Sequence, residues 1–308
     1  MTTSRRARLA RSGIRYTGLG AVKPLDEQRA DMDRLDRLPR PRHVDYLDTT
    51  VGGVPAIVAT PTAEPPDRHI LYLHGGGYVL GSPRSHISMC ARLGKRAAAT
   101  VSVIDYRLAP EHPYPAAIED CVAAYRAIAA DVDPALITIA GDSAGGGATV
   151  ATLCALRDAG DPLPGCAYVM SPWTDLTASG ESVVTKAGVD PMIDPDGLLN
   201  MARQYAGDTP LDHPGVSPLF ADLTGLPPML IQTGVDEVLL SDSTRLAEGA
   251  REAGVEVVLD LADGLWHVYQ ALSPVVPEAT EALVRAAVFI RSRTPATPTA
   301  TVATPAAT

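Results

Sequence analysis

A short glycine-flanked serine segment is the first feature of the sequence that could carry chemistry. Residues 141–145 read Gly-Asp-Ser-Ala-Gly, the G-x-S-x-G pattern that presents a serine nucleophile on a tight turn. An apolar run at 136–140 precedes it and a helical pattern at 146–159 follows it. The glycines let the chain bend sharply, and the start of a helix favours a developing negative charge. We therefore predict that Ser143 is a nucleophile.

A second glycine cluster could supply hydrogen-bond donors to the same reaction. The segment 74–77 reads His-Gly-Gly-Gly and directly follows an apolar run. Consecutive glycines let the backbone approach a ligand and turn bare N–H groups towards it. Acyl transfer needs such donors where the carbonyl oxygen becomes an oxyanion. We expect the N–H groups of Gly76, Gly77 and Ala144 to form this oxyanion hole, and His74 to fix the loop rather than act as a base.

A serine at neutral pH needs a base, and the base needs an orienting acid. On a strand–nucleophile–helix architecture the chain order is serine, acid, histidine. His267 is the last histidine of the chain and follows the last strand pattern, so we predict that it is the base. The acid is expected after the apolar run 228–233, where Asp236 and Glu237 are adjacent. Neighbouring side chains point in different directions, so only one of these two can meet the imidazole.

The elements that must position these residues alternate along the chain. Continuous apolar runs separated by helical patterns indicate a parallel sheet that is covered on both faces. Two further runs, 43–50 and 54–61, surround Gly52-Gly53 and predict an antiparallel hairpin at one edge. The predicted fold class is therefore α/β, a mostly parallel central sheet with helices on both faces. The other expected strands are 69–73, 100–104, 136–140, 166–170, 228–233 and 255–261, and the expected helices are 88–98, 116–130, 146–159, 241–253 and 278–291.

Two segments do not fit this alternation and are expected to form a helical cap over the carboxyl ends of the strands. Residues 1–42 carry a net charge of +6, which leaves −16 for the rest of the chain. Residues 178–214, approximately, are rich in Asp, Pro and Gly, with a helical stretch near 198–205. We expect a catalytic domain over 43–292, with 178–214 as its cap insertion. The Ala/Thr/Pro-rich tail 293–308 is expected to be disordered.

Composition excludes several other classes of protein. The chain has 308 residues, 46% of them hydrophobic, and a formal net charge of −10. That charge argues against a protein that coats nucleic acid, and favours a neutral or small substrate. No segment approaches the apolar length of a membrane span, and the basic N-terminus lacks the apolar run of a secretory signal. The four cysteines show no zinc-binding spacing, so we expect no metal site, and buried thiols in a reducing cytoplasm.

From about residue 44 to 291 the sequence resembles the hormone-sensitive-lipase-like (family IV) esterases of the α/β-hydrolase fold. The resemblance implies hydrolysis of a small carboxylic ester without a cofactor. It also implies a cap built from the N-terminus and an insertion before the acid, and a homodimer formed through the sheet edge. The similarity rests on His74-Gly-Gly-Gly-Tyr78, the segment 105–115 (Asp-Tyr-Arg-Leu-Ala-Pro-Glu-His-Pro-Tyr-Pro), Gly141-Asp-Ser-Ala-Gly-Gly146, Ser171-Pro-Trp-Thr-Asp175 and Trp266-His267.

The sequence departs from the family pattern at the acid. The family usually carries Asp-Pro-Leu there, whereas this chain has Asp-Glu-Val-Leu at 236–239. Aligned without gaps from Pro228 forwards, or from 246–248 backwards, Glu237 falls on the family's aspartate. Glutamate serves as the acid in some α/β-hydrolases. The resemblance therefore favours Glu237, with Asp236 as the alternative.

The expected activity is two-step acyl transfer to water through an acyl-enzyme on Ser143. The expected cap shows no long exposed apolar stretch for a lipid surface, so short acyl chains are predicted. A lactone, a sugar acetyl ester or an aryl amide would use the same residues. A non-catalytic small-molecule receptor can share the fold, but it would be expected to lack part of the triad. We also expect Asp142 to brace the serine turn or the oxyanion loop, and Trp173 and Asp175 to shape the pocket wall.

Overall fold

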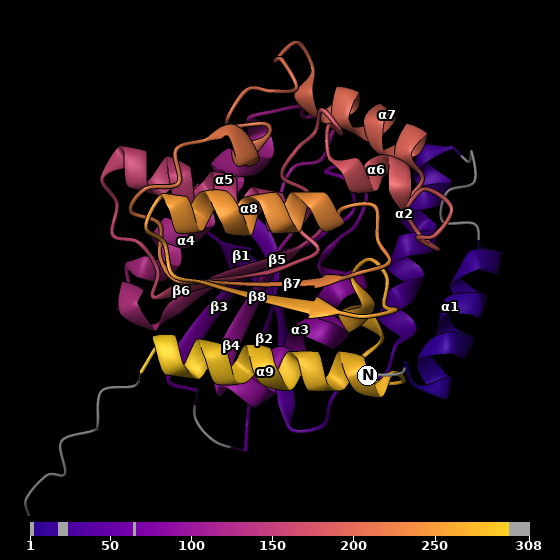
Figure 1. Ribbon diagram of the computed structural model, residues 1–308. Coiled ribbons are helices and arrows are strands. Elements are labelled where there is room, and N and C mark those ends of the chain that lie inside the picture. The colour runs from indigo at the N-terminus through magenta and orange to yellow at the C-terminus, as the bar shows by residue number, and fades with distance from the viewer. Residues whose placement is uncertain (1–2, 18–23, 64–65, 296–308) are drawn as a thin grey trace, which may run out of the picture.

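The computed structural model describes residues 3–17, 24–63 and 66–295 of the chain (Figure 1). In this part of the chain eight strands form one sheet in the order β1-β2-β4-β3-β5-β6-β7-β8. β1 and β2 form an antiparallel hairpin at one edge, β2 pairs antiparallel with β4, and all other pairs are parallel. The predicted architecture is thus confirmed. The strands are β1 (Val44–Val51), β2 (Val54–Pro61), β3 (Arg68–Leu73), β4 (Ala99–Ile104), β5 (Ile137–Asp142), β6 (Cys166–Met170), β7 (Met229–Gly234) and β8 (Val257–Ala262).

Helices cover both faces of the sheet, because the central strands are apolar on both sides. Along β3, Leu71 and Leu73 pack into one core cluster while Ile70 and Tyr72 pack into another on the opposite face. One face is covered by α3 (Pro83–Ala97) and α9 (Pro277–Arg293), and the other by α4 (Ala116–Ala129), α5 (Ala144–Ala159) and α8 (Leu240–Glu252) (Figure 1). The carboxyl ends of the parallel strands therefore share one edge, and the loops that follow them meet there.

Several boundaries differ from the expected ones for local reasons. α3 begins at Pro83 rather than 88, because Ser82 and Ser85 form a capping box ahead of the apolar pattern. α5 begins directly after the serine, since its glycine-rich first turn is helical despite carrying no apolar pattern. β8 begins at Val257 rather than 255, because the Val255 N–H closes the end of α8 on the Ala250 carbonyl oxygen.

Four further helices gather at the end towards which the arrowheads of β7 and β8 point (Figure 1). None of the helices in the described ranges has the length and apolar character that crossing a bilayer demands. The disordered tail was expected to begin at 293, but Arg293 is the last residue of α9 and Thr294 is buried, so both belong to the folded domain. Residues 296–308 lie outside the described residues. The four helices are α1 (Arg5–Thr17), α2 (Leu25–Asp33), α6 (Glu181–Thr185) and α7 (Pro195–Ala206), and the short 3-10 turns are Arg34–Arg37, Pro134–Leu136, Pro218–Phe220 and Tyr269–Leu272.

Candidate active site

Ser143 lies on a strained turn between β5 and α5. Its φ is +53° and its ψ is −123°, a backbone conformation that non-glycine residues rarely adopt. The turn fits because its neighbours carry no side chain: a Cβ on Gly145 would lie 2.0 Å from the Leu73 carbonyl oxygen. Parallel pairing of Leu73 with Gly141 brings the end of β3 beside this turn. The sequence thus holds the serine at the carboxyl edge of the sheet, next to the glycine loop at 74–77.

Three loops bring the predicted serine, histidine and acid together. The Nε2 atom of His267, after β8, lies 2.9 Å from Oγ of Ser143. The Nδ1 atom of the same ring lies 3.3 Å from Oε1 of Glu237, after β7. The three side chains are buried, with relative exposures of 9% for Ser143, 3% for His267 and 0% for Glu237. A continuous contact from hydroxyl to imidazole to carboxylate therefore exists in the folded chain.

The adjacent Asp236 faces away from this contact. Its carboxylate lies 2.6 Å from the Arg11 guanidinium of α1 and 3.6 Å from the Lys186 ammonium. Glu237 instead turns inwards, since its Oε2 accepts the Gly234 N–H of its own turn at 2.7 Å. The two adjacent carboxylates are thus separated, one towards the imidazole and one towards the cap.

Ser171 is a contact of the acid that the sequence did not single out. Its hydroxyl donates to Oε2 of Glu237 at 2.8 Å and accepts the Val268 N–H at 3.0 Å. One side chain therefore ties the acid turn to the histidine loop. The only signal in the sequence was its place in the Ser-Pro-Trp-Thr-Asp segment, where roles were expected only for Trp173 and Asp175.

The surroundings of His267 favour its charged form. Burial alone lowers the pKa of the imidazole, but the hydrogen bond to Glu237 and the negative charges of Glu237, Asp190 and Asp142 outweigh burial. The net result is a raised pKa for His267. An imidazole in such surroundings accepts a proton readily, which suits a general base.

The expected oxyanion donors lie beside the serine turn. Gly76 and Gly77 have φ of +123° and +65°, and Ala144 is the first residue of α5. Within the described ranges, no other atom accepts a hydrogen bond from the N–H groups of these three residues. These three N–H groups are therefore available to a bound ligand, and their role as an oxyanion hole stays a prediction.

Asp142 braces both the serine turn and the glycine loop. Its Oδ1 accepts the Tyr72 hydroxyl at 2.6 Å and the Gly75 N–H at 3.1 Å. Its Oδ2 lies 3.4 Å from Nε2 of His86. Burial raises the pKa of Asp142, but His86, the Tyr72 hydrogen bond and His74 together outweigh burial, so the net pKa is lowered. Asp142 is therefore an ionised brace, as expected for the residue next to the serine.

His74 is part of the scaffold of the glycine loop. Burial first, and then the neighbouring His86, lower its pKa to about 3. Its neutral ring stacks on Tyr106 with centroids 4.3 Å apart. A ring that stays neutral and makes no contact with Ser143 fits the loop-fixing role.

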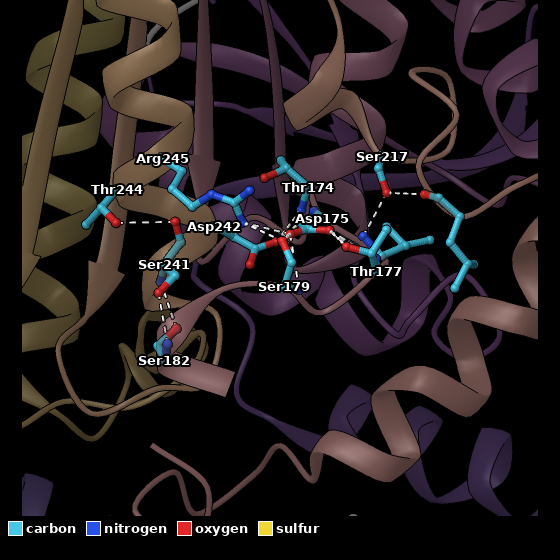
Figure 2. A network of polar contacts seen from close by, with 12 residues as sticks. Thr174, Asp175, Thr177, Ser179, Ser182, Ser217, Ser241, Asp242, Thr244 and Arg245 are labelled. Atoms are coloured by element: carbon cyan, nitrogen blue, oxygen red, sulfur yellow. Dashed lines mark hydrogen bonds and ion pairs between the residues drawn. The ribbon is translucent and has the colours of Figure 1, made fainter. Parts of the chain in front are cut away.

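The loop after β6 is fastened to the start of α8 by a polar network (Figure 2). Asp175 accepts hydrogen bonds from its own loop and pairs with Arg245 at 2.7 Å. The buried Asp242 accepts the N–H groups of Thr174 and Asp175, both at 2.8 Å, and burial raises its pKa to about 7. The backbone N–H of Trp173, in the same loop, donates to the Ser143 carbonyl oxygen at 2.9 Å. Through this backbone hydrogen bond the loop after β6 supports the turn that carries Ser143.

Known proteins are similar to this chain in sequence. Residues 70–271 match the α/β-hydrolase fold family. An acetyl-hydrolase of Streptomyces hygroscopicus is 46% identical over 228 residues, covering 74% of this chain and 76% of its own. A carboxylesterase of Mycobacterium tuberculosis is 37% identical over 226 residues, covering 70% of each chain.

Solved structures of esterases have the same fold as this chain. An esterase from the bacterial hormone-sensitive lipase family superimposes with a TM-score of 0.91 at 40% identity, covering 95% of this chain and 99% of its own. The esterase EstE5 gives a TM-score of 0.91 at 40% identity, covering 94% and 99%. The chain belongs to the hormone-sensitive-lipase-like (family IV) carboxylesterases of the α/β-hydrolase fold.

Proposed function

We propose that the protein hydrolyses short-chain acyl esters through a Ser143–His267–Glu237 triad and an acyl-enzyme intermediate. The observation that carries the proposal is the buried contact chain, 2.9 Å from hydroxyl to imidazole and 3.3 Å from imidazole to carboxylate. Asp236, the alternative acid, is engaged by Arg11 and Lys186 instead. This difference favours Glu237 as the orienting acid.

The proposed reaction has two steps, each with His267 as the proton carrier. In the first, Nε2 takes the proton of Ser143 as Oγ attacks the ester carbonyl, and the N–H groups of Gly76, Gly77 and Ala144 bind the oxyanion. The imidazolium then protonates the departing alkoxide. In the second, Nε2 activates a water that attacks the acyl-enzyme, and the proton returns to Ser143. Glu237 holds the Nδ1–H and stabilises the imidazolium in both steps.

The preference for short acyl groups is supported by side chains of α7 that cover the glycine loop. A Cβ on Gly77 would lie 2.3 Å from Sδ of Met201, so this side chain rests directly on the oxyanion loop. Tyr205 stacks on Tyr78 with ring centroids 3.7 Å apart. Space beside the oxyanion donors is therefore limited. The relative named as an acetyl-hydrolase supports the same preference.

Two experiments test this function. The first measures kcat/KM for p-nitrophenyl esters from acetyl to palmitoyl, and we expect the acetyl to butyryl esters to react fastest. The second treats the folded protein with a fluorophosphonate probe and maps the label by mass spectrometry, with label expected on Ser143. A folded sample that hydrolyses no ester and takes no label would rule out the serine-hydrolase mechanism.

The activity should depend on pH through His267. The base must be neutral to accept the serine proton, so protonation removes activity as the pH falls. Because the carboxylates around His267 raise its pKa, kcat/KM should reach half its plateau above about 6.5, the ordinary value for histidine. A pH profile between pH 5 and 9 checks this. Flat activity between pH 5 and 8 would contradict the base role.

We infer that the described parts of residues 1–42 and of 178–214 act together as the cap, over a catalytic domain at 43–292. Ala7 of α1 is buried in a cluster with Leu265 and Trp266. Arg29 of α2 donates to the carbonyl oxygens of Val79 and Ala109. Both N-terminal helices thus contact loops at the active-site end. The four cysteines are buried free thiols, which supports a reducing, cytoplasmic location.

We also propose that two copies associate through the sheet edge at β8. This strand is last in the sheet order, and Val258 is 43% exposed on it. Val284 and Val288 of α9, one turn apart, are 46% and 64% exposed. Light scattering should give twice the 32.3 kDa chain mass. Val258→Lys should yield monomer, whereas the control Val184→Lys, at an 80% exposed position of α6, should not. A monomeric wild type at micromolar concentration would contradict the dimer.

A further inference from the structure

A carboxylate of the cap holds the turn that carries Glu237. Asp190 lies between α6 and α7 and is 6% exposed. Its Oδ2 accepts the Val238 N–H at 2.9 Å, and its Oδ1 accepts the N–H groups of Met192 and Ile193 at 2.9 and 3.3 Å. Val238 directly follows Glu237. One buried side chain therefore fixes both its own cap loop and the acid turn.

The carbonyl oxygen of Val238 also accepts a hydrogen bond from a cap residue. Ser182 of α6 donates its hydroxyl to the Val238 carbonyl oxygen at 2.6 Å and accepts the Ser241 N–H at 2.8 Å. The hydroxyl of Ser241 accepts the Ser182 N–H at 2.9 Å, and Figure 2 shows this reciprocal pair. Both polar backbone atoms of the residue after the acid are thus bonded to cap side chains. The backbone next to Glu237 is therefore bonded directly to the cap.

The charge of Asp190 acts on the same histidine as the charge of Glu237. Across the described parts of the chain, no lysine or arginine forms an ion pair with Asp190. Burial raises the pKa of Asp190 and the negative charge of Glu237 adds to this, whereas the charge of His267 and the two backbone N–H groups lower it. Arg11 and Lys186 neutralise Asp236 on the outer side of the turn. The charge of Asp190 therefore favours the imidazolium form of His267.

We propose that Asp190 is a positioning residue of the triad, which holds the Glu237 turn through the Val238 N–H and stabilises the His267 imidazolium from the cap side. The inference rests on the proposed Ser143–His267–Glu237 mechanism. It makes the cap part of the catalytic machinery: with the cap unseated, the acid turn loses two backbone contacts and the imidazolium loses one of its carboxylates.

Asp190→Asn tests both parts of this role. The amide keeps one oxygen for the cap loop, but it places an N–H donor opposite the Val238 N–H and removes the charge. We expect the plateau of kcat/KM to fall roughly tenfold, and the acid limb of the pH profile to move down by about half a pH unit or more. Asp196→Asn, an exposed residue of the same cap, should leave both quantities unchanged.

The pH profile separates this role from a merely structural one. Fluorophosphonate titration of active sites and the thermal midpoint show how much of each preparation is folded. If Asp190→Asn lowers kcat/KM per active site but leaves the acid limb at the wild-type pH, the charge does not act on His267 and the inference fails. It also fails if neither quantity changes. Failure of the proposed function would appear separately, as full activity in a chain that lacks the Ser143 hydroxyl.

Discussion

Ser143→Ala is expected to lower kcat/KM for p-nitrophenyl butyrate by roughly 10⁴- to 10⁶-fold. The substitution removes the hydroxyl oxygen proposed to attack the ester, and no other described side chain contacts Nε2 of His267 by a hydrogen bond. Ala144 and the glycine loop would still bind the substrate carbonyl, so a small residual rate is expected above that of water. Stopped assays at high enzyme concentration are needed to measure it.

The matched comparison is His267→Ala, alone and combined with Ser143→Ala. Residues that act as a unit lose activity as a unit, so the double variant should be no slower than either single variant by more than a few fold. Fluorophosphonate labelling should disappear with Ser143→Ala and become very slow with His267→Ala. Retention of more than about a tenth of the wild-type rate by Ser143→Ala would place the nucleophile elsewhere.

Much of the fold could be predicted because its signals are local. Apolar runs separated by helical patterns gave the strands, and parallel strands necessarily bring the ends of β3, β5, β7 and β8 to one edge. Ser143 directly follows β5, and the loop after β8 carries His267, so both were expected at that edge. Their actual contact also depends on the strand order, because β6 and β7 lie between these two strands. The glycine loop at 74–77 was predictable for the same reason, since it follows β3.

The choice between Asp236 and Glu237 needed more than local pattern. Adjacent residues of a turn point apart, and the direction of each depends on what surrounds the turn. Here the Gly234 N–H and the Ser171 hydroxyl draw Glu237 inwards, while Arg11, 225 residues away, holds Asp236 outwards. From the sequence, only the alignment with the family indicated which of the two residues takes the place of the family's aspartate.

Two supporting residues of the site, Ser171 and Asp190, were out of reach of sequence reasoning, unlike Asp142 and His74. Ser171 and Asp190 sit in polar loops, where most serines and aspartates are simply hydrated. Their partners lie 66 and 48 positions away, and no periodicity connects such distant residues. Their importance follows from burial, because a buried carboxylate or hydroxyl must find partners.

Glu237→Ala should lower kcat by roughly 10³- to 10⁴-fold, whereas Asp236→Ala should stay within about tenfold of the wild type. Without Glu237, Nδ1 of His267 loses the carboxylate that holds its N–H, so the ring samples the wrong tautomer and the imidazolium loses its main partner. Without Asp236, the loss falls on Arg11 and Lys186, which lie on the surface side of the turn. Steady-state kinetics on p-nitrophenyl butyrate measure both effects.

Asp236→Asn and Glu237→Gln form the matched isosteric pair. Glutamine can still accept from Ser171 and the Gly234 N–H with its one oxygen, which leaves its NH2 group facing Nδ1 of His267. A large loss of kcat in Glu237→Gln therefore reports the lost charge and the lost acceptor for the Nδ1–H rather than the shape of the turn. Asp236→Asn removes a carboxylate of the same turn from the Arg11 side, and controls for any general effect of charge at this position. The reverse order, with Asp236 variants inactive and Glu237 variants active, would make Asp236 the acid. It would require the turn to rotate away from its contacts with Ser171 and Arg11, a change that the thermal midpoint of each variant would also register.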